Sequence, residues 1–186
     1  MLGAFHLGSD SLARAQGRLT EETMAATDWQ LVGLTPNDDG TLTTVDGDPQ
    51  MILENVGDRV VRTISYTAQF DGEARELCLY YTTKVGEDYS ADRRVFPRSV
   101  GEGRYIYTLP RTSLAALRLD PCSPEENKTV TLTMSSITLN AADTLPHFWQ
   151  YFVPSWYQAF CLVLYPALAA AAVSMAAAIV PGRKRN

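Results

Sequence analysis

Apolar and polar residues alternate through the middle of this chain, which is the pattern of a strand with one buried and one solvated face. The clearest case is RVVRTISYTAQF at residues 59–70, where most of the even-numbered residues are apolar. This alternation predicts a β-strand that packs on a core. Its inward face is predicted to carry Val60, Ile64, Tyr66 and Phe70, and its outward face Thr63, Ser65, Thr67 and Gln69.

Several shorter segments repeat the pattern, and turn-forming sequences such as PNDDG, DGDP and VGEG separate them. About eight short strands in about 110 residues, without helices between them, predict a mainly β fold, an antiparallel β-sandwich of jelly-roll type. The further strands are predicted in TLTTV, PQMIL, ELCLYYT, RRVF, RYIYTL, AALRL and KTVTLTM, with Leu77, Leu79, Tyr81, Val130, Leu132 and Met134 pointing inward.

The end of the chain has a different pattern. From Trp156 to Val180 no residue is charged, and only Gln158 and Ser174 are clearly polar. A helix of about 20 residues crosses the hydrocarbon core of a bilayer, so this run predicts a C-terminal transmembrane helix. The alternative is an Ala-rich core helix of a soluble protein, which the length, the absence of charge and the flanking residues disfavour.

The residues that flank the apolar run indicate its orientation. The basic cluster Arg183, Lys184 and Arg185 follows it, and basic residues beside a span stay on the cytoplasmic side. Aromatic residues crowd the other side, in PHFWQYFVPSWYQ, as they do at headgroup depth. We therefore expect a single-pass membrane protein, with the lipid bilayer as a partner, an extracytoplasmic N-terminal domain and a cytoplasmic C-terminus.

The N-terminus raises a question, because MLGAFHLGSDSLARAQ has neither the basic start nor the apolar core of a signal peptide. One interpretation is that MLGAFHLGS ends an upstream span and that Met1 is an internal methionine. The other is a cytoplasmic domain with a tail anchor, which puts the basic cluster on the wrong side of the membrane. The next residues, SDSLARAQGRLTEETMAA, predict a short helix with Ser9 or Asp10 as its N-cap.

These patterns predict five regions along the chain. They are a helical segment at residues 1–27, the β-sandwich at 28–143, an aromatic juxtamembrane segment at 144–155, the transmembrane helix at 156–180, and a basic cytoplasmic tip at 181–186.

Charge and motifs exclude several function classes. Residues 1–146 contain all 21 acidic residues and all but three of the 16 basic ones, so this region is acidic and unsuited to nucleic acid. His6 and His147 lie far apart, and the sequence has no Cys/His cluster, no G-x-S-x-G and no phosphate-binding glycine loop. We therefore expect a protein that is not an enzyme, with no catalytic residue, no metal and no cofactor.

Two features leave alternatives open. The segment DGDP, with Asp46 and Asp48, is interpreted as a turn, although carboxylates are also ligands that calcium accepts. An oxidising exterior permits a disulfide between Cys78 and Cys122. However, Cys78 is predicted on the outward face of its strand and Cys122 in a loop, which disfavours the pairing.

One predicted outward face has the composition of a ligand-binding surface. If Leu79 and Leu117 point inward, then Tyr80, Arg118 and Asp120 point outward. Sugars bind such surfaces, because a pyranose ring stacks its C–H face on an aromatic ring while its hydroxyls bind polar side chains. The competing interpretation is structural, with Arg118 in an ion pair and Asp120 at a strand end. The predicted ligand-binding residues are Tyr80, Gln69, Arg118 and Asp120.

Four segments carry a resemblance to a known group of modules. DGDPQMIL, LCLYYTTKVGEDYS, YIYTLPRTSLAALRLDP and VTLTMSSITL, in this order, resemble the extracytoplasmic jelly-roll modules of bacterial membrane proteins. Among those are glycosyltransferase-like proteins of cell-surface polysaccharide assembly, and the modules are similar to carbohydrate-binding sandwiches. The resemblance, over residues 28–140, implies a non-catalytic carbohydrate-binding-like module.

The sequence therefore predicts a membrane-anchored extracytoplasmic sandwich for recognition or docking, with a cell-surface oligosaccharide as its ligand. The alternative is a non-catalytic assembly subunit that binds another membrane protein, and a hydrolase without a visible signature ranks third. An exposed aromatic ring beside free polar groups favours the sugar, and a flat apolar patch favours the protein partner.

Overall fold

The structure, a computed structural model, describes residues 2–154 and 156–179. The chain divides into two compact units. One is Gly8–Pro146, and the other combines the described residues of Met1–Leu7 and His147–Asn186. The predicted basic tip at 181–186 lies outside the described residues, as does Met1.

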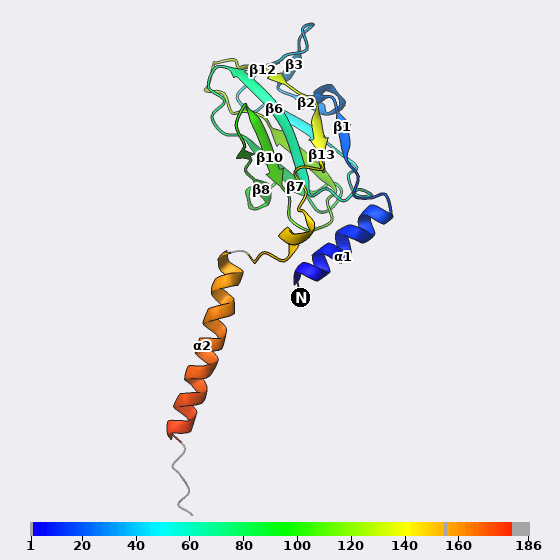
Figure 1. The fold of residues 1–186 in the computed structure, drawn as a ribbon. Coiled ribbons are helices and arrows are strands. Elements are labelled where there is room, and N and C mark those ends of the chain that lie inside the picture. The colour runs from blue at the N-terminus through cyan, green and yellow to red at the C-terminus, as the bar shows by residue number, and fades with distance from the viewer. Residues whose placement is uncertain (1, 155, 180–186) are drawn as a thin grey trace, which may run out of the picture. The chain divides into compact units, whose positions relative to one another are not determined.

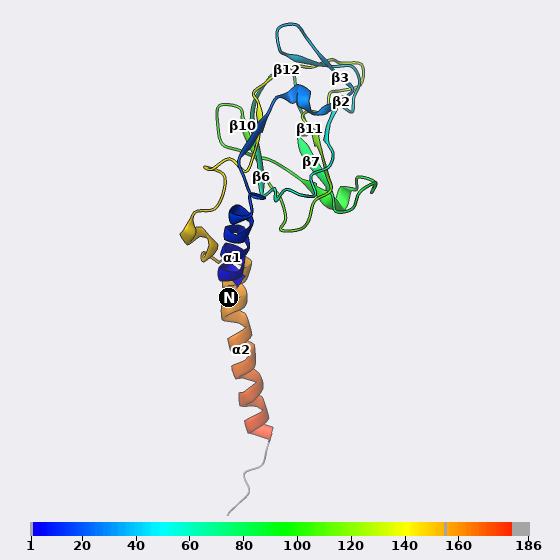
Figure 2. The ribbon, with the colours of Figure 1, turned by 90° about the vertical axis from the view of Figure 1, so that its right-hand side faces the viewer.

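Two antiparallel sheets form the unit Gly8–Pro146 (Figure 1). Figure 2 shows the sheet of β6 and β10 on one side and the sheet of β7 and β11 on the other. The smaller sheet contains, in spatial order, β2 (Gln30–Val32), β5 (Gln50–Leu53), β11 (Ala116–Asp120), β7 (Cys78–Thr82) and β8 (Arg94–Val95). The larger sheet contains β1 (Glu22–Met24), β3 (Leu34–Pro36), β4 (Leu42–Thr44), β6 (Thr63–Asp71), β9 (Arg98–Ser99), β10 (Arg104–Thr108), β12 (Thr131–Met134) and β13 (Ile137–Leu139).

The connections confirm the predicted antiparallel sandwich of jelly-roll type. From β5 onward the chain passes back and forth between the sheets, through β6, β7, β10, β11 and β12 in turn. Such crossings place sequence neighbours in opposite layers, which is how a jelly roll closes around its core. Short 3-10 turns interrupt the strands at η1 (Ala26–Asp28) and η2 (Ala91–Arg93).

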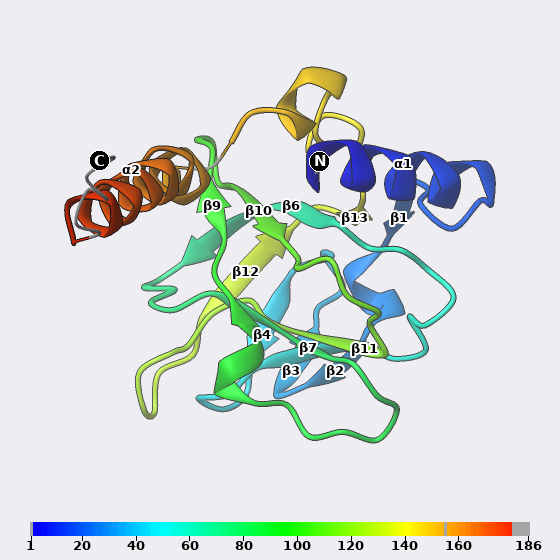
Figure 3. The ribbon, with the colours of Figure 1, turned by 90° about the horizontal axis from the view of Figure 1, so that it is seen from below.

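The strand β6 organises the larger sheet (Figure 3). β10 pairs along one side of it, and β12 and β13 follow one another along the other side. Met134 lies opposite Ala68, whereas Thr138 lies opposite Ser65, so the register shifts by one residue between these pairs. The extra residue forms a bulge at 135–136, which lets one continuous segment bend with the sheet.

The core lies between the two sheets and confirms the inward face of the alternation. Thr63 and Ser65, predicted on the solvated face of the same strand, are buried as well; Thr144, from the segment after β13, hydrogen-bonds the Thr63 hydroxyl at 2.6 Å. Ile64 and Leu132 from the larger sheet and Leu79 from the smaller one are fully buried, as predicted. Two core tyrosines, Tyr66 and Tyr107, satisfy each other through a 3.1 Å hydrogen bond between their hydroxyls. Among the other positions predicted to point inward, Tyr66 and Val130 are buried, and Phe70, Tyr81 and Met134 are partly buried against the core.

The N-terminal region differs from the prediction. The helix α1 spans Leu2–Ala15, so Asp10 lies in its interior and neither it nor Ser9 is the N-cap. The reason is tertiary, because the Asp10 carboxylate is buried and paired with arginines of the sandwich. After α1, Gly17 adopts a φ of +67° and its N–H donates to the Arg14 carbonyl at 3.0 Å, which ends the helix.

Short strands at the sheet edges were not predicted. β1, β2, β3 and β9 have two or three residues each, too few for an alternation to be visible. β1 pairs with β13, so the sheet already begins at Glu22, before the expected boundary at residue 28. Val60 and Leu77, predicted to point inward from strands, lie just outside β6 and β7 and are half-buried.

The second unit contains η3 (Phe148–Tyr151) and α2 (Trp156–Ile179). At a rise of about 1.5 Å per residue, 24 residues extend about 36 Å, more than the hydrocarbon core of a bilayer. The helix continues through Pro166, and its mean hydropathy over Trp156–Ala177 reaches 2.0. α2 is therefore long and apolar enough to cross a membrane.

Candidate ligand-binding face

The outer face of the smaller sheet brings three of the four predicted ligand-binding residues together. Tyr80 on β7 is the cross-strand partner of Arg118 on β11 and of Arg94 on β8. Asp120 lies two residues beyond Arg118 on the same face. We call this surface, formed by Tyr80, Arg94, Arg118 and Asp120 with Asp48 and Gln50 beside them, the Tyr80 face.

Arg118 occupies the centre of the Tyr80 face. Its Nε and Nη2 donate to the two carboxylate oxygens of Asp120 at 2.7 and 2.8 Å, and Nη2 also donates to Asp48 Oδ1 at 2.7 Å. The guanidinium carbon lies 5.1 Å from the centroid of the Tyr80 ring, a cation–π contact. The Gln50 amide donates to the other Asp48 oxygen at 2.6 Å. Arg118 is therefore held in one orientation by two carboxylates and a ring.

Arg94 flanks Tyr80 on the other side. Its Nη1 donates to Glu76 Oε1 at 2.8 Å, and its guanidinium carbon lies 4.7 Å from the centroid of the Phe96 ring. It also hydrogen-bonds the Tyr80 hydroxyl. A strand was predicted at RRVF, and β8 lies there with Val95 packed against the core. Alternation around Val95 was the signal in the sequence that Arg94 faces outward.

Burial and charge both act on the ionisable groups of this face. Burial raises the pKa of Asp120, and the hydrogen bonds from Arg118 oppose that shift. Burial, followed by the nearby Asp120, raises the pKa of the Cys78 thiol to about 11. Burial and a hydrogen bond with Cys78 raise the pKa of Tyr80. Cys78 therefore stays a neutral thiol, and Tyr80 a neutral phenol, at physiological pH.

Gln69 does not belong to this face, contrary to the prediction of one shared surface. It lies on β6 in the larger sheet, opposite Thr133, and it is exposed. The inward residues of both sheets meet in one core, so the outward faces of β6 and β7 point to opposite sides of the sandwich. Alternation places a residue inside or outside, but it does not state which sheet its strand joins.

The aspartates of DGDP form a turn. The Asp48 N–H donates to Asp46 Oδ1 at 3.0 Å, as in an Asx-turn. Within residues 2–154 and 156–179, no group of three or more His, Cys, Asp or Glu side chains is arranged to hold a metal ion. Cys78 and Cys122 are both buried and carry free thiols.

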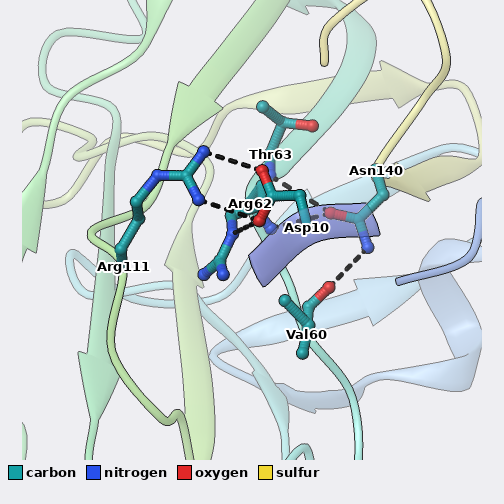
Figure 4. A network of polar contacts seen from close by, with 6 residues as sticks. All are labelled: Asp10, Val60, Arg62, Thr63, Arg111 and Asn140. Carbon is teal, nitrogen blue, oxygen red and sulfur yellow. Dashed lines mark hydrogen bonds and ion pairs between the residues drawn. The ribbon is translucent and has the colours of Figure 1, made fainter. Parts of the chain in front are cut away.

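A second polar cluster, which the sequence analysis missed, surrounds Asp10 (Figure 4). The Asp10 side chain is fully buried, and Arg111 donates to both of its oxygens at 2.8 and 2.7 Å. Arg62 Nε donates to Oδ1 at 3.1 Å. These contacts join α1 to residues far away in sequence, and nothing local in SDSLARA indicates them. A carboxylate without exposed surface cannot meet a ligand, so the cluster is structural.

Asn140 extends this cluster on the side of Arg62 away from Arg111 (Figure 4). Its Oδ1 accepts from the Arg62 backbone N–H at 2.7 Å, and its Nδ2 donates to the carbonyls of Val60 and Thr20 at 2.8 and 3.1 Å. Asn140 has a φ of +54°, a region that asparagine enters more readily than most residues. Its side chain therefore satisfies the Arg62 N–H and the Val60 carbonyl just before β6 begins.

The chain is similar to some solved structures, at low sequence identity and with TM-scores below 0.5. No protein-family model matches the chain, and a search of curated proteins finds no match. A low-affinity xylan-binding module from Roseburia intestinalis is 16% identical, with 68% of this chain and 99% of that chain covered and a TM-score of 0.42. A β-1,3-glucan-binding module from Bacillus halodurans is 10% identical over 67% of this chain and 97% of that chain, with a TM-score of 0.38. A family two carbohydrate esterase from Cellvibrio japonicus is 16% identical over 64% of this chain and 33% of that chain, with a TM-score of 0.39. At these values the likeness carries no argument about a ligand of this chain.

Proposed function

We propose that this chain is a membrane-anchored, non-catalytic recognition module that binds carbohydrate at the Tyr80 face. The observation that supports this most directly is the setting of Tyr80, a half-buried ring in the middle of a solvent-facing sheet. Polar groups from one further segment, Asp48 and Gln50, lie next to its neighbour Arg118. An aromatic surface with fixed donors and acceptors at its edge suits a pyranose ring and its hydroxyls.

The residues of the face have different roles in this proposal. Tyr80 supplies the apolar contact for the C–H face of the sugar. The Asp48 side chain, 67% exposed, and the Gln50 amide supply hydrogen bonds to hydroxyls. Asp120 is a positioning residue, because both of its oxygens already accept from Arg118. Holding Arg118 and Tyr80 in place before the ligand arrives lowers the entropy cost of binding.

Replacing Tyr80 by alanine is expected to abolish detectable glycan binding. One stacking contact and a few hydrogen bonds in water supply only about 4–6 kcal/mol, so wild type should bind with a dissociation constant on the order of 0.1–1 mM. Tyr80→Phe keeps the ring and should retain most of the affinity. The full chain in nanodiscs is screened on a glycan array, and hits are titrated by calorimetry against both variants.

Gln69→Ala is the matched control, because it removes an exposed polar side chain from the opposite sheet. It should bind as wild type does. If no glycan on the array binds, or if wild type and Tyr80→Ala bind equally, the Tyr80 face is rejected as a carbohydrate site.

We further propose that α2 anchors the chain with its C-terminus in the cytoplasm and the sandwich outside. The support is the apolar length of α2 together with the basic residues 183–185 that follow it in sequence. An epitope tag is placed at each end of the chain, and intact cells are treated with protease. We expect the sandwich to be digested and the C-terminal tag to be protected; the reverse pattern rejects this orientation.

One observation favours the second candidate, a docking subunit for another membrane protein. Arg118 is already paired with two aspartates and Arg94 with Glu76, so the charges of the Tyr80 face are largely compensated within it. Phe96, next to Arg94, is 54% exposed. If the array is silent, crosslinking from a photoreactive residue at position 96 in cells tests for a protein partner.

A further inference from the structure

The second unit has no charged side chain in its described part. Residues 2–7 and 147–179 contain no Asp, Glu, Lys or Arg, whereas Gly8–Pro146 contains every acidic residue of the chain. Ordinary protein surfaces are about a quarter charged, and a water-facing segment of this length without any charge is unusual. The composition therefore separates a water-facing unit from an uncharged one.

The uncharged unit also exposes large aromatic side chains outside α2. Phe5 on α1 is 71% exposed and Trp149 on η3 is 76% exposed. Phe148 and Phe152, which contact each other with their ring centroids 5.4 Å apart, are each about half exposed. Water-exposed apolar area costs about 25 cal/mol per Å², so this surface gains from being covered.

A close backbone contact joins the start of α1 to η3. A Cβ atom added at Gly3 would overlap the carbonyl oxygen of Tyr151 and contact Phe152 Cα at 3.5 Å. Only glycine lets the helix approach the η3 backbone this closely. Gly8, one and a half turns later in α1, has nothing within 4 Å of the same added atom. The glycine at position 3 therefore has a packing reason that the one at position 8 lacks.

We propose that residues 2–7 of α1 and η3 form one lipid-facing platform in the headgroup layer of the bilayer that α2 crosses. The platform residues in contact with lipid are Phe5, Phe148, Trp149 and Phe152. Lipid is the occupant, because only three residues separate Phe152 from the first residue of α2, and because aromatic rings without neighbouring charges prefer the interface. This inference rests on the proposed anchoring by α2.

The test measures lipid contact at two positions of the full chain in phosphatidylcholine nanodiscs. An environment-sensitive fluorophore is attached either to the native Cys161 in α2 or to Phe5→Cys in a Cys161→Ser background. Cys78 and Cys122 are buried and do not compete for the label. We expect emission at both positions to shift to shorter wavelength, to be quenched by nitroxide lipids and to be shielded from iodide. A label at Val45→Cys, an exposed valine of the sandwich, should show none of these effects.

Two glycine variants test whether the platform is one body. Gly3→Ala should displace α1 from η3 and remove most of the wavelength shift at position 5. Gly8→Ala is the matched control, because it makes the same change in the same helix without a clash and should leave the shift intact. Both variants must retain the shift at Cys161, which shows that α2 is still inserted.

The outcomes separate this inference from the proposed anchoring. If the label at Cys161 reports a water environment, the anchoring and the platform are both rejected. If the label at Cys161 reports lipid but the label at position 5 reports water, only the platform is rejected. Lipid contact at position 5 that Gly3→Ala does not change rejects the joint platform of α1 and η3.

Discussion

Replacing Arg62 and Arg111 together by alanine is expected to lower the free energy of unfolding by about 3–5 kcal/mol. The double replacement leaves the Asp10 carboxylate, which has no exposed surface, without either of the arginines that donate to it. A buried charge that loses its arginine partners keeps its desolvation cost without their compensation. Arg111→Ala alone should cost about 1.5–3 kcal/mol, because Arg62 still donates to Oδ1.

Adding Asp10→Leu to the double variant identifies the cause. Leucine has no charge, has a side chain of similar size to aspartate and suits a helix. The buried carboxylate is then absent, so most of the lost stability should return. The control is Arg104→Ala, which breaks an exposed ion pair with Asp143 and should cost under about 1 kcal/mol. Urea unfolding of the full chain in nanodiscs, followed by circular dichroism, measures the four variants against wild type. If Asp10→Leu brings no recovery, the loss does not come from the buried charge.

Truncating Leu132 to alanine is expected to cost about 2–5 kcal/mol. Leu132 is completely buried on β12, and its strand pairs with both β4 and β6, so two neighbouring strands hold the walls of the cavity in place. When the surroundings cannot collapse, the truncation loses the transfer free energy of the removed atoms and also leaves a cavity, and both lower the stability. The same unfolding experiment measures the change.

Thr133→Ala is the matched control for this variant. Thr133 is the next residue on β12, but it points to solvent on the outer face of the larger sheet. Its replacement should change the free energy of unfolding by less than about 0.5 kcal/mol. Equal effects at 132 and 133 would contradict the assignment of the two faces.

The larger strands were predictable because their chemistry is periodic. Ile64 and Leu132 each stand between polar neighbours, and a two-residue period has one interpretation when only one face is buried. The apolar helix at the end of the chain was predictable for a similar reason, since length and absence of charge are local properties. Edge strands such as β9, with two residues, are created by their neighbours and carry no such period.

The candidate face was predictable only in part. Alternation correctly turned Tyr80 and Arg118 outward, and β7 and β11 happen to be neighbours in one sheet. It turned Gln69 outward equally well, but β6 belongs to the other sheet. The pairing of Arg118 with Asp48 depends on a turn seventy residues away in sequence folding over β11, and no spacing rule predicts such a contact.

The sequence by itself determined most of the inward positions of the longer strands, that the chain is an antiparallel sandwich, and where an apolar helix lies, because each follows from local periodicity or composition. Only the tertiary structure decided which strands share a sheet, that Asp10 lies inside a helix against two arginines, and that Gly3 meets the backbone at Tyr151. The physical reason is that these contacts join segments that are not adjacent in sequence; Asp10 and Arg111, for example, are 101 residues apart. Their free energy comes from burial and pairing that exist only after the chain has closed on itself.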